Sequence, residues 1–264
     1  SPDRFIVKLP LTPAGLVAVR RLSASGIPVN FTLGFSARQN YLAALFSRPA
    51  YVNVFMGRLN AFVSASGVGD GENVGEKTTL ATQRYVRKLR TEGRTPSRLI
   101  GASIRSGAQV AAVIGTDVLT MPPKAAAHYQ GAAPSEIRSR VDDDPEVSTA
   151  RGHSVDEFYG QSLWEVSDAF VEAVESLLAN DADRVTPDAL VNHCAEAGVG
   201  DLFPPWSAED RDTATTDGKI PVFATWHSRL AAKQIGLDAL MNLSALRSFA
   251  TDQRALDDRV RGLI

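Results

Sequence analysis

Short apolar runs alternate with amphipathic segments over the first 130 residues of the chain. In the amphipathic segments the apolar residues recur every three or four positions, which places them on one face of a helix. Strands and helices that alternate in this way are typical of a parallel sheet with helical crossovers. The runs that we predict to be strands are Arg4–Pro10, Val29–Phe35, Tyr51–Arg58, Arg98–Ile104 and Val118–Met121.

The segments between these runs carry the signals of helix ends. Thr12 and Pro13 supply an N-cap and a first-turn proline, and Gly26 is a residue type that commonly ends a helix. Because the strands are apolar almost throughout, we expect both faces of the sheet to be buried. Right-handed crossovers then favour a barrel or a doubly wound sheet, and a closed barrel of this type needs eight strands. The further predicted helices are Ser36–Phe46, Thr78–Arg90 and Gln109–Ile114.

After residue 130 the pattern becomes helical. Arg140–Glu146 has the composition of a loop or linker, and a stretch punctuated by prolines 204, 205 and 221 is predicted to be rich in loops. We therefore divide the chain into an α/β region, 1–130, and a helical C-terminal region, 131–264. Its predicted helices are Val155–Leu178, with one continuous apolar stripe, Pro187–Ala197 and Leu237–Ile264.

Composition and charge exclude several classes of function. The 264 residues are 44% hydrophobic and 22% charged, with a net charge of −2, so nothing attracts the chain to nucleic acid or to an anionic membrane. The single cysteine, Cys194, cannot form an internal disulfide, and a reducing, cytoplasmic location fits best. No apolar run reaches the roughly 20 residues of a membrane span. The histidines lack metal-ligand spacing, and GENVGEKTT lacks the glycine spacing of a phosphate-binding loop.

Lys8 is the first polar residue with candidate chemistry, because it interrupts the apolar run FIVKLP. One interpretation is an edge or strand-terminal lysine that reaches water. The other is a lysine that projects into a buried space, where desolvation lowers the pKa of an amine and makes it a better nucleophile toward carbonyls. The run by itself leaves both interpretations open.

Polar residues also stand late in the other predicted strands, where barrel enzymes place catalytic groups. Side chains alternate along a strand, so residues two apart share a face. Two arginines at successive strand ends suit a sugar phosphate, because guanidinium binds phosphate in a bidentate manner. The candidates are Asn30 and Thr32, then Asn53 and Phe55 with Arg58, then Ser103 with Arg105.

Several motifs resemble the transaldolase family. The segment VKLPLTPAGLVAVRRLSASGIPVNFTLGFS is similar to the family's Schiff-base lysine segment, K-[IL]-P-x-T-x-x-G-L followed by G-I-x-V-N-x-T-L-x-F-S. VFMGRL resembles its F-V-G-R-[IL], and GASIRS its A-S-[FI]-R. TMPP is similar to the exit of the eighth strand, and SFATDQRALDDRV to the closing helix. The resemblance covers residues 4–130 and, more loosely, 240–260, and it implies a (β/α) barrel of which this chain carries strands four to eight.

The resemblance also implies roles for the candidate residues. Lys8 would be the Schiff-base nucleophile, Asn30 would hydrogen-bond the bound substrate, and Thr32 would help to hold a proton-relaying water. Asn53, where many members carry serine, can still donate a hydrogen bond. Phe55 replaces the tyrosine of the related fructose-6-phosphate aldolases, which favours aldol transfer over free cleavage. The substrate phosphate would be bound by Arg58, Arg105 and Ser103.

One departure from the family is serious. The family's first three strands carry an acid–base aspartate, a T-T-N-P-S motif and a glutamate that positions water, and none of these motifs occurs in this sequence, so a circular permutation is not supported. We expect a chain that lacks three strands, completed by a second copy or by a complementing N-terminal chain. Open sheet edges would favour such partners. We interpret residues 141–226 as a helical insertion.

The expected function is therefore transaldolase activity on sugar phosphates in the pentose phosphate pathway, without a metal or an organic cofactor. Two alternatives remain open. The chain could be an inactive transaldolase-like scaffold that binds a sugar phosphate or a partner, or it could be an aldolase of the fructose-6-phosphate type.

Overall fold

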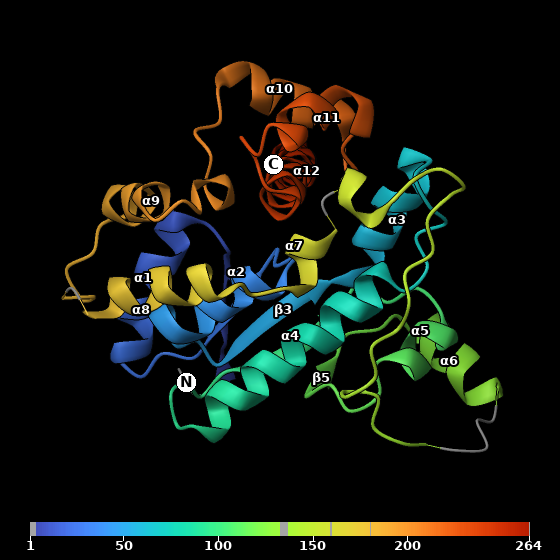
Figure 1. Ribbon diagram of the computed structural model, residues 1–264, viewed down its shortest axis with the longest axis horizontal. Coiled ribbons are helices and arrows are strands. Elements are labelled where there is room, and N and C mark those ends of the chain that lie inside the picture. Colours follow the sequence, from blue (N-terminus) through green and yellow to red (C-terminus); the bar gives the residue numbers. More distant parts are fainter. Residues whose placement is uncertain (1–3, 133–136, 159, 180, 264) are drawn as a thin grey trace.

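A single sheet of five parallel strands organises the first half of the chain. The computed structural model describes residues 4–132, 137–158, 160–179 and 181–263. The strands lie side by side in sequence order, so each crossover connects neighbouring strands (Figure 1). This is an α/β fold of the barrel type, with five strands among the described residues, and the predicted fold class is confirmed. The strands are β1 (Val7–Pro10), β2 (Val29–Thr32), β3 (Tyr51–Phe55), β4 (Arg98–Ala102) and β5 (Val118–Leu119).

Three helices of this half begin at hydroxyl residues that cap them, Thr12, Ser36 and Ser106. The Thr12 hydroxyl accepts a hydrogen bond from the amide of Gly15, and Ser36 caps the next helix in the same way. The predicted helix Ser36–Phe46 becomes π-helical after Leu42, and two helices, α3 and α6, start where strands or a proline stop were predicted. The helices are α1 (Pro13–Ala24), α2 (Ala37–Leu42), η2 (Ala43–Ser47), α3 (Met56–Ser66), α4 (Val74–Thr91), α5 (Gly107–Ala112) and α6 (Pro123–Gly131).

One face of the sheet is buried over its central strands. Helices α1 and α4 pack against this face, where Phe31, Val52 and Leu99 have no exposed area. The opposite face alternates with it and carries polar and half-buried residues, including the exposed Lys8. The expectation that both faces are buried is therefore wrong, because none of the described elements fills the second face as a helix layer fills the first.

The second half is helical, as predicted, but more divided. The stretch predicted as the helix Val155–Leu178 is broken, because the backbone becomes extended at Glu165; residue 159 lies outside the described residues. Its apolar stripe is nevertheless buried, including Phe158 and Phe170. Two helices, α10 and α11, occupy the stretch predicted to be loop-rich. The elements are η3 (Val155–Phe158), α7 (Gln161–Trp164), α8 (Asp168–Ala179), α9 (Pro187–Glu196), η4 (Gly200–Leu202), α10 (Ala208–Asp217), α11 (Phe223–Ala231) and α12 (Leu237–Arg261).

The last helix, α12, is fastened to the first half by buried polar contacts. Asp238 at its start accepts hydrogen bonds from Ser36 at 2.6 Å and from Arg38 at 2.7 and 2.8 Å. Burial by itself lowers the pKa of Arg38, but Asp238 and Asp201 raise it above its ordinary value, so this guanidinium stays charged. One turn on, the Asn242 amide donates to the carbonyl oxygens of Leu11 and Leu33 at 2.9 and 2.8 Å. These contacts hold α12 across the carboxyl ends of β1 and β2.

Two properties bear on partners and location. In the described part of the chain β1 forms an edge of the sheet, and the side chains of Phe5, Ile6 and Val7 are 70%, 52% and 37% exposed beside it. None of the helices described here combines the length and the hydrophobicity that a bilayer crossing requires. Cys194 is buried and carries a free thiol.

The division of the chain at residue 130 and the insertion at 141–226 stay predictions. Ile264, the end of the last predicted helix, lies outside the described residues.

Candidate active site

A hollow of about 290 Å³ opens on the less buried face of the sheet. Strand register explains its composition: Lys8 lies opposite Asn30, and Asn53 lies opposite Ile100. Since neighbouring positions in register project from the same face, all five strands contribute to one surface. Six of the eight predicted residues line the hollow, together with three that were not predicted: Lys8, Asn30, Asn53, Phe55, Arg58 and Ser103, with Ile100, Ala102 and Thr120.

Lys8 stands at the open side of this hollow. Its side chain is exposed, because in the described residues no strand pairs with the outer edge of β1. Of the two interpretations that the sequence left open, the structure shows the edge lysine that reaches water. Enclosure of Lys8 would require an element beside β1 that the described part of the chain does not supply.

Asn30 and Thr32 share a face of β2, as predicted. The side-chain oxygen of Asn30 and the hydroxyl of Thr32 are both buried, and neither has a hydrogen-bond partner among the described residues. A buried polar group without a partner costs free energy, and such groups are retained where a ligand or water satisfies them. Thr32 is 5% exposed and does not line the hollow.

The Asn53 amide is oriented by the loop that follows β2. The side-chain oxygen of Asn53 accepts a hydrogen bond from the backbone amide of Gly34 at 3.0 Å. The backbone carbonyl oxygen of Asn53 accepts one from the side-chain amide of Asn40, also at 3.0 Å. A side chain at Gly34 would place its Cβ 2.1 Å from that carbonyl oxygen, so only glycine permits the close approach. With its oxygen engaged, Asn53 has its two N–H donors available to a ligand in the hollow.

Arg58 and Arg105 bring two positive charges close together. Arg58 lies in the first turn of α3, and its Nη1 is buried without a partner in the described part of the chain. Burial, and then the charge of Arg105, lower the pKa of Arg58. Arg105 does not line the hollow itself; it lines an adjoining pocket with the buried Glu76. An unpaired guanidinium next to a second one is a favourable environment for a phosphate dianion.

The close approach of the two arginines depends on Gly57. A Cβ at this position would lie 2.1 Å from the carbonyl oxygen of Ser103 and 3.0 Å from Nε of Arg105. Ser103 itself adopts a left-handed conformation with φ of 62°, which a residue other than glycine seldom takes. Backbone strain of this kind concentrates at functional sites, where the surrounding structure holds it in place.

Sequence reasoning missed the contribution of α12. The Phe249 ring lies 6.4 Å from the Phe55 ring and 5.5 Å from the guanidinium carbon of Arg58. Asp252, one turn further along α12, partly offsets the effect of Arg105 on the pKa of Arg58. The segment SFATDQRALDDRV contains both residues, but its resemblance to a closing helix assigned no role to either.

Comparisons with known proteins bear on the family to which this chain belongs. A model of the family described as transaldolase/fructose-6-phosphate aldolase matches residues 1–180. A probable transaldolase of Nitrosopumilus maritimus is 42% identical over 123 residues, which are 46% of this chain and 50% of that protein. A probable transaldolase of Thermus thermophilus is 43% identical over 120 residues, 45% of this chain and 48% of the relative.

A third relative extends the comparison to another bacterium. The probable transaldolase of Aquifex aeolicus is 37% identical over 124 residues, 46% of this chain and 51% of its own length. The chain thus spans about half the length of the curated relatives that it matches. The family model covers more than half of the chain, and the motifs around Lys8, Arg58 and Arg105 fall inside the matched residues. The chain belongs to the transaldolase/fructose-6-phosphate aldolase family.

Proposed function

We propose that the hollow transfers a dihydroxyacetone unit from a ketose phosphate to an aldose phosphate through a Schiff base on Lys8. The observation that supports this most directly is the grouping of a lysine, two amides and an arginine in one hollow. Family membership supports the reaction class. The substrates would be the sugar phosphates of the pentose phosphate pathway.

In the proposed reaction the Lys8 amine adds to the C2 carbonyl of the ketose, and water leaves to give an iminium. Cleavage of the C3–C4 bond releases an aldose phosphate, and its electron pair is held as an enamine on the lysine. The enamine carbon then attacks the aldehyde of the acceptor, and hydrolysis returns the free amine. The iminium supplies the electrophile, so the reaction needs no metal or organic cofactor.

The other residues would bind and orient. The N–H donors of Asn53 and the amide of Asn30 would hydrogen-bond substrate hydroxyls, and the Thr32 hydroxyl would hold a water that relays protons. Arg58, assisted by Arg105 and Ser103, would bind the phosphate, since the Arg58 Nη1 has no partner among the described residues. Anchoring the phosphate far from the reacting bond orients the C2 carbonyl toward the amine.

The proposed reaction also requires an acid–base group in addition to the residues that line the hollow. This chain matches about half of each relative, and among the described residues no aspartate or glutamate lines the hollow. We infer that an acid–base group comes from a polypeptide segment outside the described residues, such as a second copy or a complementing N-terminal segment, that pairs with the outer edge of β1. The exposed Phe5, Ile6 and Val7 would be covered by that segment.

Borohydride trapping tests the nucleophile. The protein is mixed with fructose 6-phosphate, reduced, and analysed by intact mass and peptide mapping. We expect a dihydroxyacetone-sized adduct on Lys8 that is absent in Lys8→Ala and present in Lys124→Ala, which removes an exposed lysine on α6. An adduct that persists in Lys8→Ala would refute the assignment.

A second candidate function is sugar-phosphate binding without catalysis. The exposure of Lys8 favours it, as does a lining that, in the described part of the chain, contains no carboxylate. Calorimetric binding of fructose 6-phosphate that depends on Arg58, together with no trapped adduct, would support this candidate over transfer. Aldol cleavage without transfer is disfavoured by Phe55, which offers an aromatic ring but no hydroxyl to the hollow.

A further inference from the structure

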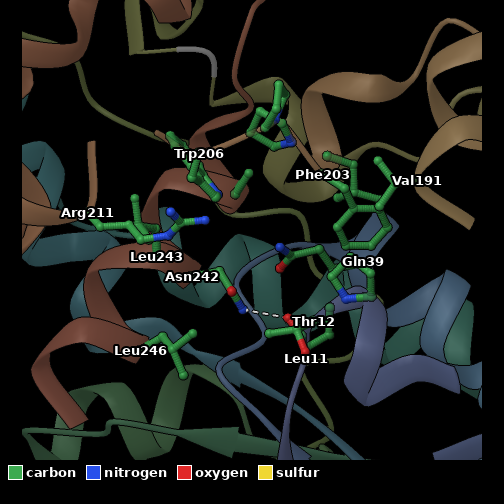
Figure 2. A pocket seen from close by; sticks show the side chains of 15 residues that line it. Leu11, Thr12, Gln39, Val191, Phe203, Trp206, Arg211, Asn242, Leu243 and Leu246 are labelled. Carbon is green, nitrogen blue, oxygen red and sulfur yellow. Dashed lines mark hydrogen bonds between the residues drawn. The ribbon is translucent and has the colours of Figure 1, made fainter. Parts of the chain in front are cut away.

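A second cavity, of about 420 Å³, lies between α12 and the segment that joins η4 to α10. Figure 2 shows Trp206 with Leu243 and Leu246 of α12 on one side of it and Phe203 with Val191 on the other. None of its lining residues belongs to the hollow around Lys8. Its volume falls within the roughly 300–1,000 Å³ of small-molecule sites, and its walls are mostly apolar.

Two polar side chains are directed into this cavity from opposite sides (Figure 2). Gln39 is 1% exposed; its side-chain oxygen accepts a hydrogen bond from the amide of Phe35 at 2.9 Å. Its amide nitrogen donates no hydrogen bond to a described residue, so its N–H groups are available to a ligand in the cavity. Arg211 of α10, an exposed residue at the rim of the cavity, approaches from the other side.

The aromatic wall is held in place before any ligand arrives. Trp206 packs edge-on against Trp226, with ring centres 6.0 Å apart, and the guanidinium carbon of Arg229 lies 5.6 Å from the Trp206 ring. Arg229 is in turn ion-paired with Asp210 at 2.5 Å. Pro204 and Pro205 stiffen the backbone that leads to Trp206. A preformed wall reduces the entropy lost on binding.

We propose that this cavity binds a small organic monocarboxylate with an apolar body. Arg211 would pair with the carboxylate, the Gln39 amide would donate to it, and the aromatic and aliphatic walls would bury the hydrocarbon. One guanidinium matches one negative charge. A phosphate ester would bring a second charge into an apolar environment, and a sugar phosphate would leave its hydroxyls without partners there. The site is therefore chemically distinct from the hollow around Lys8.

Isothermal titration calorimetry of the full chain tests this proposal, with octanoate, octan-1-ol and octyl phosphate as probes. We expect saturable one-to-one binding of octanoate, with octan-1-ol weaker by about tenfold or more, the effect of a charge-assisted hydrogen bond. The affinity of the Arg211→Gln variant for octanoate should fall by the same factor. The matched control is Arg21→Gln, which removes an exposed arginine from α1 and should bind as the unchanged protein does.

A filling variant locates the site. Val191 lines the cavity and is half-buried, so Val191→Trp should block octanoate binding while thermal unfolding remains cooperative. The proposal would be overturned if octanoate gave no saturable heat, if octan-1-ol or octyl phosphate bound as tightly, or if Arg21→Gln lost as much affinity as Arg211→Gln. Undiminished binding to a folded Val191→Trp would also overturn it.

Discussion

The guanidinium carbon of Arg58 lies 5.5 Å from the centre of the Phe249 ring, although the two residues are separated by most of the chain. Phe249 also contacts Phe55, so α12 supplies an apolar wall against the charge that we propose binds phosphate. A cation–π contact of this kind attracts the guanidinium and holds it in one orientation. The contact therefore makes the last helix a part of the candidate active site.

Truncating this ring should weaken phosphate binding. Phe249→Ala removes a contact worth about 0.5–1 kcal/mol, so the affinity for fructose 6-phosphate should fall roughly two- to fivefold. Titration calorimetry measures the change. Leu256→Ala, on the exposed part of the same helix, should leave the affinity unaltered. Equal affinity in both variants would mean that Phe249 does not support the Arg58 site.

Gly57 should not tolerate a methyl group. In Gly57→Ala the new Cβ would meet the Ser103 carbonyl oxygen at 2.1 Å, and the backbone must shift to relieve the overlap. We expect a loss of about 1–3 kcal/mol in the free energy of unfolding by urea. Gly131→Ala is the matched control, because nothing lies within 4 Å of its Cβ and helix propensity favours alanine. Similar stability of the two variants would contradict the close packing of α3 on β4.

Removing the charge of Asp238 should destabilise the protein strongly. Asp238 is fully buried, and Asp238→Asn leaves Arg38 with one of its two carboxylate partners, Asp201. Breaking a buried pair typically costs about 3–5 kcal/mol, which urea unfolding at pH 7 would detect. Asp258→Asn removes an exposed partner of Arg261 and should change stability by less than about 1 kcal/mol. A small effect at Asp238 would show that α12 is not fastened through this contact.

Asp117 should make stability depend on pH. Burial by itself raises the pKa of Asp117, but hydrogen bonds from Arg90, the amide of Leu99 and Gln83 lower it below its ordinary value. A lowered pKa in the folded state contributes stability at pH above the unfolded pKa, roughly 4, and this contribution is lost as the pH falls through the folded pKa. Asp117→Asn should therefore cost about 2 kcal/mol at pH 7 and progressively less below pH 4. Urea unfolding at several pH values measures the difference, and a cost that is constant with pH would contradict the assignment.

The order of strands and helices was predictable because each element carries its own local signals. Thr12 caps the first helix as predicted, and alternation along β2 gives Asn30 and Thr32 a common face. The start of α3 was missed because the apolar run that forms β3 continues through Met56, and Gly57 packs closely against the backbone of Ser103 at the end of β4. Local periodicity contains no information about that contact.

The burial of the sheet and the role of α12 could not be predicted for a related reason. An apolar strand looks the same whether one face or both are covered, so the exposure of Lys8 follows from what lies beside β1 and not from FIVKLP itself. Phe249 and Asp252 reach Arg58 only because Asp238 and Asn242 hold α12 across the strand ends. Contacts between residues so far apart in sequence leave no local pattern.

The two hydrogen bonds of Asn242 also determine when this architecture can form during synthesis. They join residues 231 and 209 positions apart, and the carbonyl groups of Leu11 and Leu33 leave the ribosome long before their donor. At roughly 5–20 residues per second, the strands wait on the order of ten seconds or more for the helix that joins them. A nascent chain therefore holds Lys8 and Arg58 without the helix that completes their surroundings. During translation, the candidate active site is therefore completed only after α12 has been synthesised.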